Sequence, residues 1–90
     1  MADLSHPAIL TAEETCGACP VQWEGTLTDG GPFYFRYRFA TASLARTPDS
    51  PEVSMPFGDH RLDGIFESDE DRDRVFAELH AQLMLMEAEV

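Results

Sequence analysis

The segment Val21–Ala42, VQWEGTLTDGGPFYFRYRFATA, decides the fold. Alternating apolar and polar residues lie on both sides of a turn sequence, DGGP, at residues 29–32. Because alternate residues of a strand point to the same face, this pattern predicts two paired strands with one apolar face. We expect a β-hairpin over residues 21–42. Its apolar face is formed by Val21, Trp23, Gly25 and Leu27 on the first strand, and by Phe33, Phe35, Tyr37 and Phe39 on the second.

The length of the turn sets the register of this hairpin. A three-residue loop, Asp29 to Gly31, places Leu27 opposite Phe33 and keeps both apolar rows on one face. The remaining pairs of this register are Gly25 with Phe35, Trp23 with Tyr37, Val21 with Phe39, Glu24 with Arg36, and Gln22 with Arg38. The last two are polar pairs on the outer face.

Residues 68–89 carry the clearest helix signal. Ser68 precedes three acidic residues, 69–71, which favour the positive end of a helix dipole. Capping and the dipole explain every residue of this acidic cluster, so it predicts a helix start and not a binding site. An apolar stripe follows at helical spacing, through Phe76, Leu79, Leu83, Met86 and Val90. This stripe is expected to cover the aromatic face of the hairpin.

The rest of the chain gives weaker signals. Residues 1–10 are expected to form a flexible arm, and residues 11–14 have the spacing of a capping box, which predicts one short helical turn. The proline-rich stretch 43–58 is typical of a linker, within which residues 52–55 form a short edge strand. Residues 59–66 are expected to form a third strand.

These elements predict one small α+β domain over residues 1–90. Its two layers are an antiparallel hairpin with one or two further short strands, and a single C-terminal helix. No second domain or internal repeat is visible in the sequence.

Charge excludes several classes of function. The chain holds 17 Asp and Glu against six Arg, it has no Lys, and its net charge is -11. Direct binding to nucleic acid needs rows of cationic side chains, and the missing Lys removes Walker-type phosphate sites and Schiff-base chemistry. With no nucleophile motif either, we expect a protein that is not an enzyme and needs no cofactor.

Residues 1–7 resemble neither a signal peptide nor a membrane span, so a cytoplasmic protein with no membrane partner is expected. The choice of Arg over Lys, with much Ala, Gly and Pro, is typical of a GC-rich coding sequence and suggests an actinobacterial or phage origin.

Cys16 and Cys19 are the only residues with catalytic or metal-binding spacing, C-x-x-C. A redox pair is disfavoured, because a proline and a strand follow where a thioredoxin-like site has a helix. Zinc needs more ligands, which His60, with His80 or His6, supplies from distant parts of the chain. Structural thiols are the favoured interpretation, and a zinc site of Cys16, Cys19 and His60 is the alternative.

Two surfaces are candidates for binding a protein partner. On the outer hairpin face, Tyr34, Arg36 and Arg38 suit a carboxylate or phosphate group, unless Glu24 and neighbouring acids neutralise both Arg. The last helical turns are apolar nearly all round, because several apolar residues lie outside the main stripe. These include Met84, Leu85 and Ala88. Either a second copy of the chain or the N-terminal arm is expected to cover them.

The leading interpretation is therefore a small acidic protein-interaction module that forms a homodimer through its C-terminal helix. One alternative is a DNA mimic, whose carboxylates occupy the basic groove of a nucleic-acid-binding protein. Another is a module stabilised by zinc.

Overall fold

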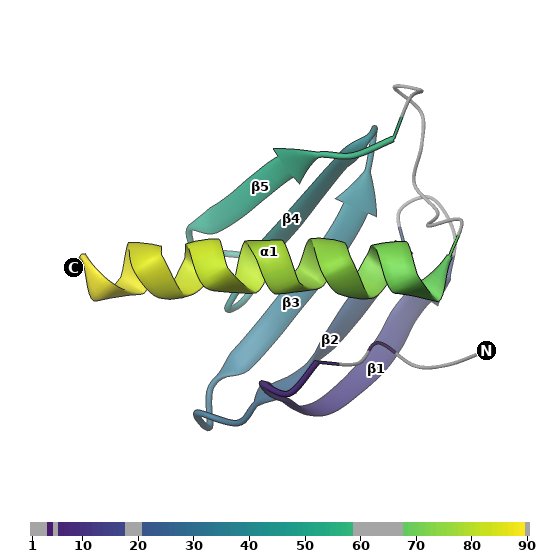
Figure 1. The fold of residues 1–90 in the computed structure, drawn as a ribbon. Coiled ribbons are helices and arrows are strands. Elements are labelled where there is room, and N and C mark those ends of the chain that lie inside the picture. The colour runs from purple at the N-terminus through teal and green to yellow at the C-terminus, as the bar shows by residue number, and fades with distance from the viewer. Residues whose placement is uncertain (1–3, 5, 18–20, 59–67, 90) are drawn as a thin grey trace.

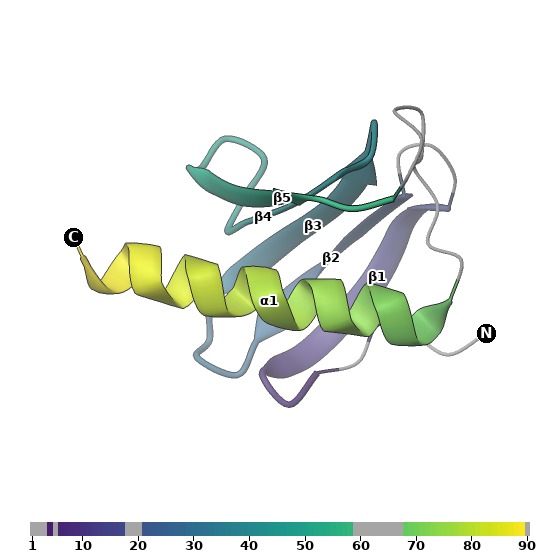
Figure 2. The same ribbon diagram turned by 45° about the horizontal axis from the view of Figure 1, so that its top comes forward.

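The computed structural model describes residues 4, 6–17, 21–58 and 68–89, and its elements are five strands and one helix (Figure 1). The elements are β1 (Ile9–Gly17), β2 (Val21–Leu27), β3 (Pro32–Arg38), β4 (Thr41–Ala45), β5 (Glu52–Pro56) and α1 (Asp69–Ala88). The strands pair antiparallel in chain order, β1-β2-β3-β4-β5. Because α1 lies across one face of this sheet, the expected two-layer α+β fold is confirmed (Figure 2).

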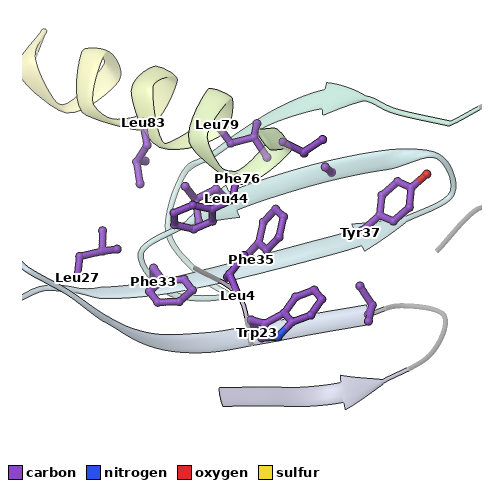
Figure 3. Close-up of a cluster of buried hydrophobic side chains, with 13 residues drawn as sticks. Leu4, Trp23, Leu27, Phe33, Phe35, Tyr37, Leu44, Phe76, Leu79 and Leu83 are labelled. Atoms are coloured by element: carbon purple, nitrogen blue, oxygen red, sulfur yellow. The ribbon is translucent and has the colours of Figure 1, made fainter. Parts of the chain in front are cut away.

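The inner face of the sheet is aromatic, as its alternation predicts. Trp23, Phe33 and Phe35 are buried, and they point towards the helix (Figure 3). The ring of Phe76 lies edge-on to the rings of Phe33 and Phe35, with centroids 5.6 and 5.4 Å apart. Leu79 of the same helix is fully buried. The helix therefore covers the aromatic row with the stripe expected for it.

The start of the helix also follows the sequence. Ser68 caps it by accepting a hydrogen bond from the backbone amide of Asp71 (3.1 Å). Arg72 is buried, lies over the Trp23 ring at 5.5 Å, and forms ion pairs with Asp69 and Asp73. Asp69 and Asp73 thus neutralise the buried guanidinium of Arg72 near the start of the helix.

The N-terminal region differs from its prediction. The segment expected to be a flexible arm includes Leu4, which is buried in the core. The residues expected to form a helical turn belong to the edge strand β1. The predicted turn is wrong because the segment pairs with β2 along its length, with irregularities between Ile9 and Thr11 and between Glu14 and Cys16. At Gly25, a Cβ would overlap the Thr11 carbonyl, so β1 can approach β2 this closely only across a glycine.

Residues 41–45, predicted as the end of the hairpin and the start of the linker, form the separate strand β4, and the expected edge strand is β5. Leu44 of β4 is fully buried opposite Phe35. The third strand expected over residues 59–66 lies outside the described residues.

The predicted hairpin register is wrong by two residues. Trp23 pairs with Phe35, not with Tyr37, and Glu24 pairs with Tyr34, not with Arg36. The loop has the predicted three residues but begins one residue earlier, at residues 28–30, because Leu27 donates its amide to the Gly31 carbonyl (2.8 Å) and accepts from the Gly30 amide (3.0 Å). Gly31 also donates its amide to the Asp29 side chain (2.9 Å). A shift of two residues leaves every side chain on its predicted face, which is why the burial pattern still agrees.

Phe39 is the exception to the predicted aromatic row. It does not face Val21 in the core, but lies with Ala40 in the two-residue connection between β3 and β4, and its side chain is 54% exposed. Both residues have positive φ, 54° and 55°, as a type I′ hairpin turn requires. The Ala40 carbonyl accepts a hydrogen bond from the Phe57 amide (2.9 Å) and helps to hold the turn. Neither residue is a type that favours this backbone conformation.

We predict that a variant carrying both Phe39→Asn and Ala40→Gly is more stable than the parent, by about 1–2 kcal/mol in the free energy of unfolding. The substitutions remove backbone strain and little buried surface. Urea denaturation followed by circular dichroism measures the difference. Gly30→Ala is the control: Gly30 has a φ of 87° with open space around it, so this change adds strain and should destabilise. A double variant no more stable than the parent would contradict the assigned turn.

Candidate functional site

The outer face of the sheet carries the polar side chains of alternate residues. Tyr34, Arg36 and Arg38 share this face on the central strand β3, as predicted. Across the strand pairs, Arg36 lies between Gln22 of β2 and Ser43 of β4. No described helix or strand covers this side of the sheet, since α1 lies on the other (Figure 2).

A shallow hollow of about 200 Å³ opens on this face beside β3. It is lined by Arg36, Arg38, Phe39, Thr41, Ser43, Glu52 and Ser54. The sequence did not predict this grouping, because it gave no strand over residues 41–45 to bring Thr41 and Ser43 beside β3 and to join the expected edge strand, with Glu52 and Ser54, to the sheet. The available signal was the alternation of polar Thr41 and Ser43 with apolar Ala42 and Leu44.

Arg36 and Arg38 differ from the other described arginines in their charge partners. Arg46, Arg72 and Arg74 each pair with carboxylates, at 2.6 to 3.0 Å. Among the residues that the structure describes, neither Arg36 nor Arg38 forms an ion pair with a carboxylate. The expected neutralisation by Glu24 is therefore not seen. Arg38 instead stacks on Phe39, with its guanidinium carbon 4.6 Å from the ring centroid.

The second candidate surface is the solvent side of α1. Leu85 is 67% exposed and Ala88 is exposed, whereas Met84 is half-buried against the core. Ala81 is exposed one turn before Leu85. The C-terminal turns of α1 extend past the ends of the strands (Figures 1 and 2). An apolar strip thus remains uncovered on the helix.

The described part of the N-terminal arm does not cover this strip. His6 packs on the other flank of the helix, where its ring lies 5.4 Å from Phe76 and 5.1 Å from His80. Partial burial, followed by the charges of His6 and Arg46, lowers the pKa of His80 and so favours its neutral form.

Arg46 fixes the end of the helix to the sheet. Its guanidinium makes two hydrogen bonds to Glu87 (2.8 and 2.8 Å) and two to Asp29 (2.6 and 3.2 Å). These bonds, with the amide of Gly31, lower the pKa of Asp29 to about 2, and Arg46 also lowers the pKa of Glu87. This network joins the β2–β3 turn, the segment after β4, and the last turn of α1.

We predict that Arg46→Gln lowers the urea midpoint at pH 7 and that the difference from the parent shrinks in acid. Because the pKa of Asp29 is lower in the folded state than its ordinary value of about 4, its pairing stabilises above pH 4 and is lost as the pH falls towards 2. Urea midpoints measured between pH 7 and pH 2 test this. Arg74→Gln, which removes the same charge from an exposed pair, is the control and should cost less. A pH-independent difference for Arg46→Gln would contradict the assignment.

The predicted zinc ligands are not brought together within the described structure. Cys19 and His60 lie outside the described residues, and Cys16 is described only as part of the β1 backbone. Among the described residues, no group of three or more His, Cys, Asp or Glu side chains has the geometry to hold a metal ion.

Comparison with known proteins gives no relative. No protein-family model, no curated protein and no solved structure matches this chain. In the described part of the chain, no helix combines the length and the apolar character needed to span a membrane. No activity or partner is therefore carried over from another protein.

Proposed function

We propose that the protein is a non-enzymatic interaction module that forms a homodimer through the solvent side of α1. The single observation that supports this most directly is the 67% exposure of Leu85 within an apolar strip of the helix. Burying a leucine of this exposure stabilises an interface by about 1.5–3 kcal/mol at most. A two-fold dimer buries two of them.

The spacing of the strip supports helix pairing. Ala77, Ala81, Leu85 and Ala88 follow one another at four-, four- and three-residue intervals, so they lie on one side of the helix. The alanines leave room for a second helix to approach closely, and Leu85 supplies the side chain that fills the space. In an antiparallel pair centred near Ala81, Leu85 of each copy lies against Ala77 of the other.

Charge is also compatible with this arrangement. The same antiparallel pairing brings Arg74, whose side chain is 67% exposed, towards Glu89 of the second copy. These contacts lie at the two ends of the strip and favour the antiparallel orientation over the parallel one. They offset part of the repulsion between two chains that each carry a net charge of -11.

The DNA-mimic alternative has less support. A mimic needs carboxylates that remain free to meet cationic groups of its target. At the start of α1, the side chains of Asp69, Asp71 and Asp73 instead pair with Arg72 and Arg74. This internal pairing favours the interaction module.

We predict that Leu85→Asp converts the homodimer to a monomer without unfolding it. The substitution places a carboxylate in the apolar interface but changes no buried contact of the monomer. Sedimentation equilibrium of parent and variant at about 100 µM, in low and high salt, measures the mass of the protein in solution. A dimer with a Kd near 1 µM has a free energy of dissociation of about 8 kcal/mol. High salt should not dissociate the parent, since the interface is mainly apolar.

Leu10→Asp is the matched control, because Leu10 is 66% exposed on β1 and the change in charge is identical. It should leave the dimer intact. A parent that is monomeric under these conditions, or a Leu85→Asp variant with the parent's mass, would refute the proposed interface.

A further inference from the structure

We propose that the hollow on the outer sheet face is a second binding site, which receives a carboxylate side chain of a protein partner. The observation that leads to this proposal is that two arginines beside the hollow have no carboxylate partner among the described residues. In a chain with 17 Asp and Glu, Arg36 and Arg38 are left without a carboxylate in the described structure, and both line the hollow. An external carboxylate would supply the missing partner.

The donors of the hollow are arranged for one acid group. Arg36 and Arg38 are two residues apart on one strand, so their Cα atoms are roughly 7 Å apart and their guanidinium groups can converge on one ligand. Ser43 and Ser54 line the same hollow and carry hydroxyl groups, and Thr41 lines it as well, with its hydroxyl donating to the Phe39 carbonyl (3.3 Å). Ser43 is only 5% exposed and lies directly opposite Arg36, so a mostly buried polar residue lines the hollow beside this arginine.

Phe39 links the site to the strain in the β3–β4 turn. A non-glycine residue with positive φ costs about 1–3 kcal/mol, and such strain is found at binding sites more often than elsewhere. Here the strained backbone holds an exposed aromatic ring at the rim of the hollow, with Arg38 stacked on it. Exposed aromatic and Arg side chains are the types that contribute most to protein interfaces.

The charges around the hollow favour a carboxylate over a phosphate. Glu52 lines the hollow, and Glu24 lies next to Arg36 on the same face. A phosphate group, with a charge of about -1.5 to -2, is repelled more strongly by these acids and by the net charge of -11 than a carboxylate with a charge of -1. Glu52 can in turn accept a hydrogen bond from a backbone amide of the partner.

A capped Glu-Glu dipeptide is the probe that tests the site, and a capped phosphoserine dipeptide is the comparison. In ¹⁵N-labelled protein, the Glu-Glu probe should cause saturable shifts of the Arg36 and Arg38 Nε–H signals and of the Ser43 amide, with an affinity of about 1–10 mM. Arg36→Gln and Arg38→Gln should each weaken binding about fivefold to tenfold. Arg74→Gln removes the same charge from the helix and should leave binding within about twofold.

The Leu85→Asp variant should bind the Glu-Glu probe as the parent does, because outward-facing residues of β3, β4 and β5 line the hollow, whereas α1 lies on the other face of the sheet (Figure 2). A failure of this site is therefore distinguishable from a failure of the proposed dimer. Three results would overturn the site: shifts that do not saturate, an Arg74→Gln variant weakened as much as Arg36→Gln, or tighter binding of the phosphoserine probe.

Discussion

The contact between the Phe76 ring and the rings of Phe33 and Phe35 joins the two layers of this protein, and the other features depend on it. The three rings are buried and lie edge-on at 5.4 to 5.6 Å, a geometry that favours aromatic pairs. With the inner face of the sheet occupied in this way, the outer sheet face and the outer side of α1 are the two broad faces of the described elements that stay open to solvent. Both proposals therefore concern these two surfaces.

Much of this architecture follows from the periodicity of the sequence. The two-residue alternation around Trp23 and Phe35 and the helical spacing of Phe76 and Leu79 each determine a buried face, because burial depends on which side of an element a residue occupies. The same reasoning placed Arg36 on the outer face. The register error of two residues did not affect any of these faces.

Two strands, β1 and β4, were not predicted from the sequence, and each omission has a physical explanation. Glycine and asparagine are the usual signals of a two-residue hairpin turn, but the β3–β4 turn uses Phe39 and Ala40 in a strained conformation. Without that signal, Phe39 looked like a continuation of the aromatic row, and β4 looked like a linker. β1 was missed because its backbone irregularities interrupt the alternation and its acidic residues are typical of a helix start.

The candidate sites could be predicted in part for the same reasons. The strand period gives the shared face of Tyr34, Arg36 and Arg38. That Arg36 has no carboxylate partner among the described residues agrees with the true register, which moves Glu24 opposite Tyr34. The hydroxyls and Glu52 of the hollow come from β4 and β5, so they required the three-dimensional structure. On the helix, Leu85 was predicted correctly as lying outside the buried stripe.

The stability of a Phe76→Ala variant, measured by urea denaturation against Leu85→Ala on the opposite side of the helix, tests the central contact most directly. We predict a loss of about 3–5 kcal/mol for Phe76→Ala, because it leaves a cavity beneath the sheet, and a loss of less than about 1 kcal/mol for Leu85→Ala in the monomer. Similar small losses for both variants would contradict the account.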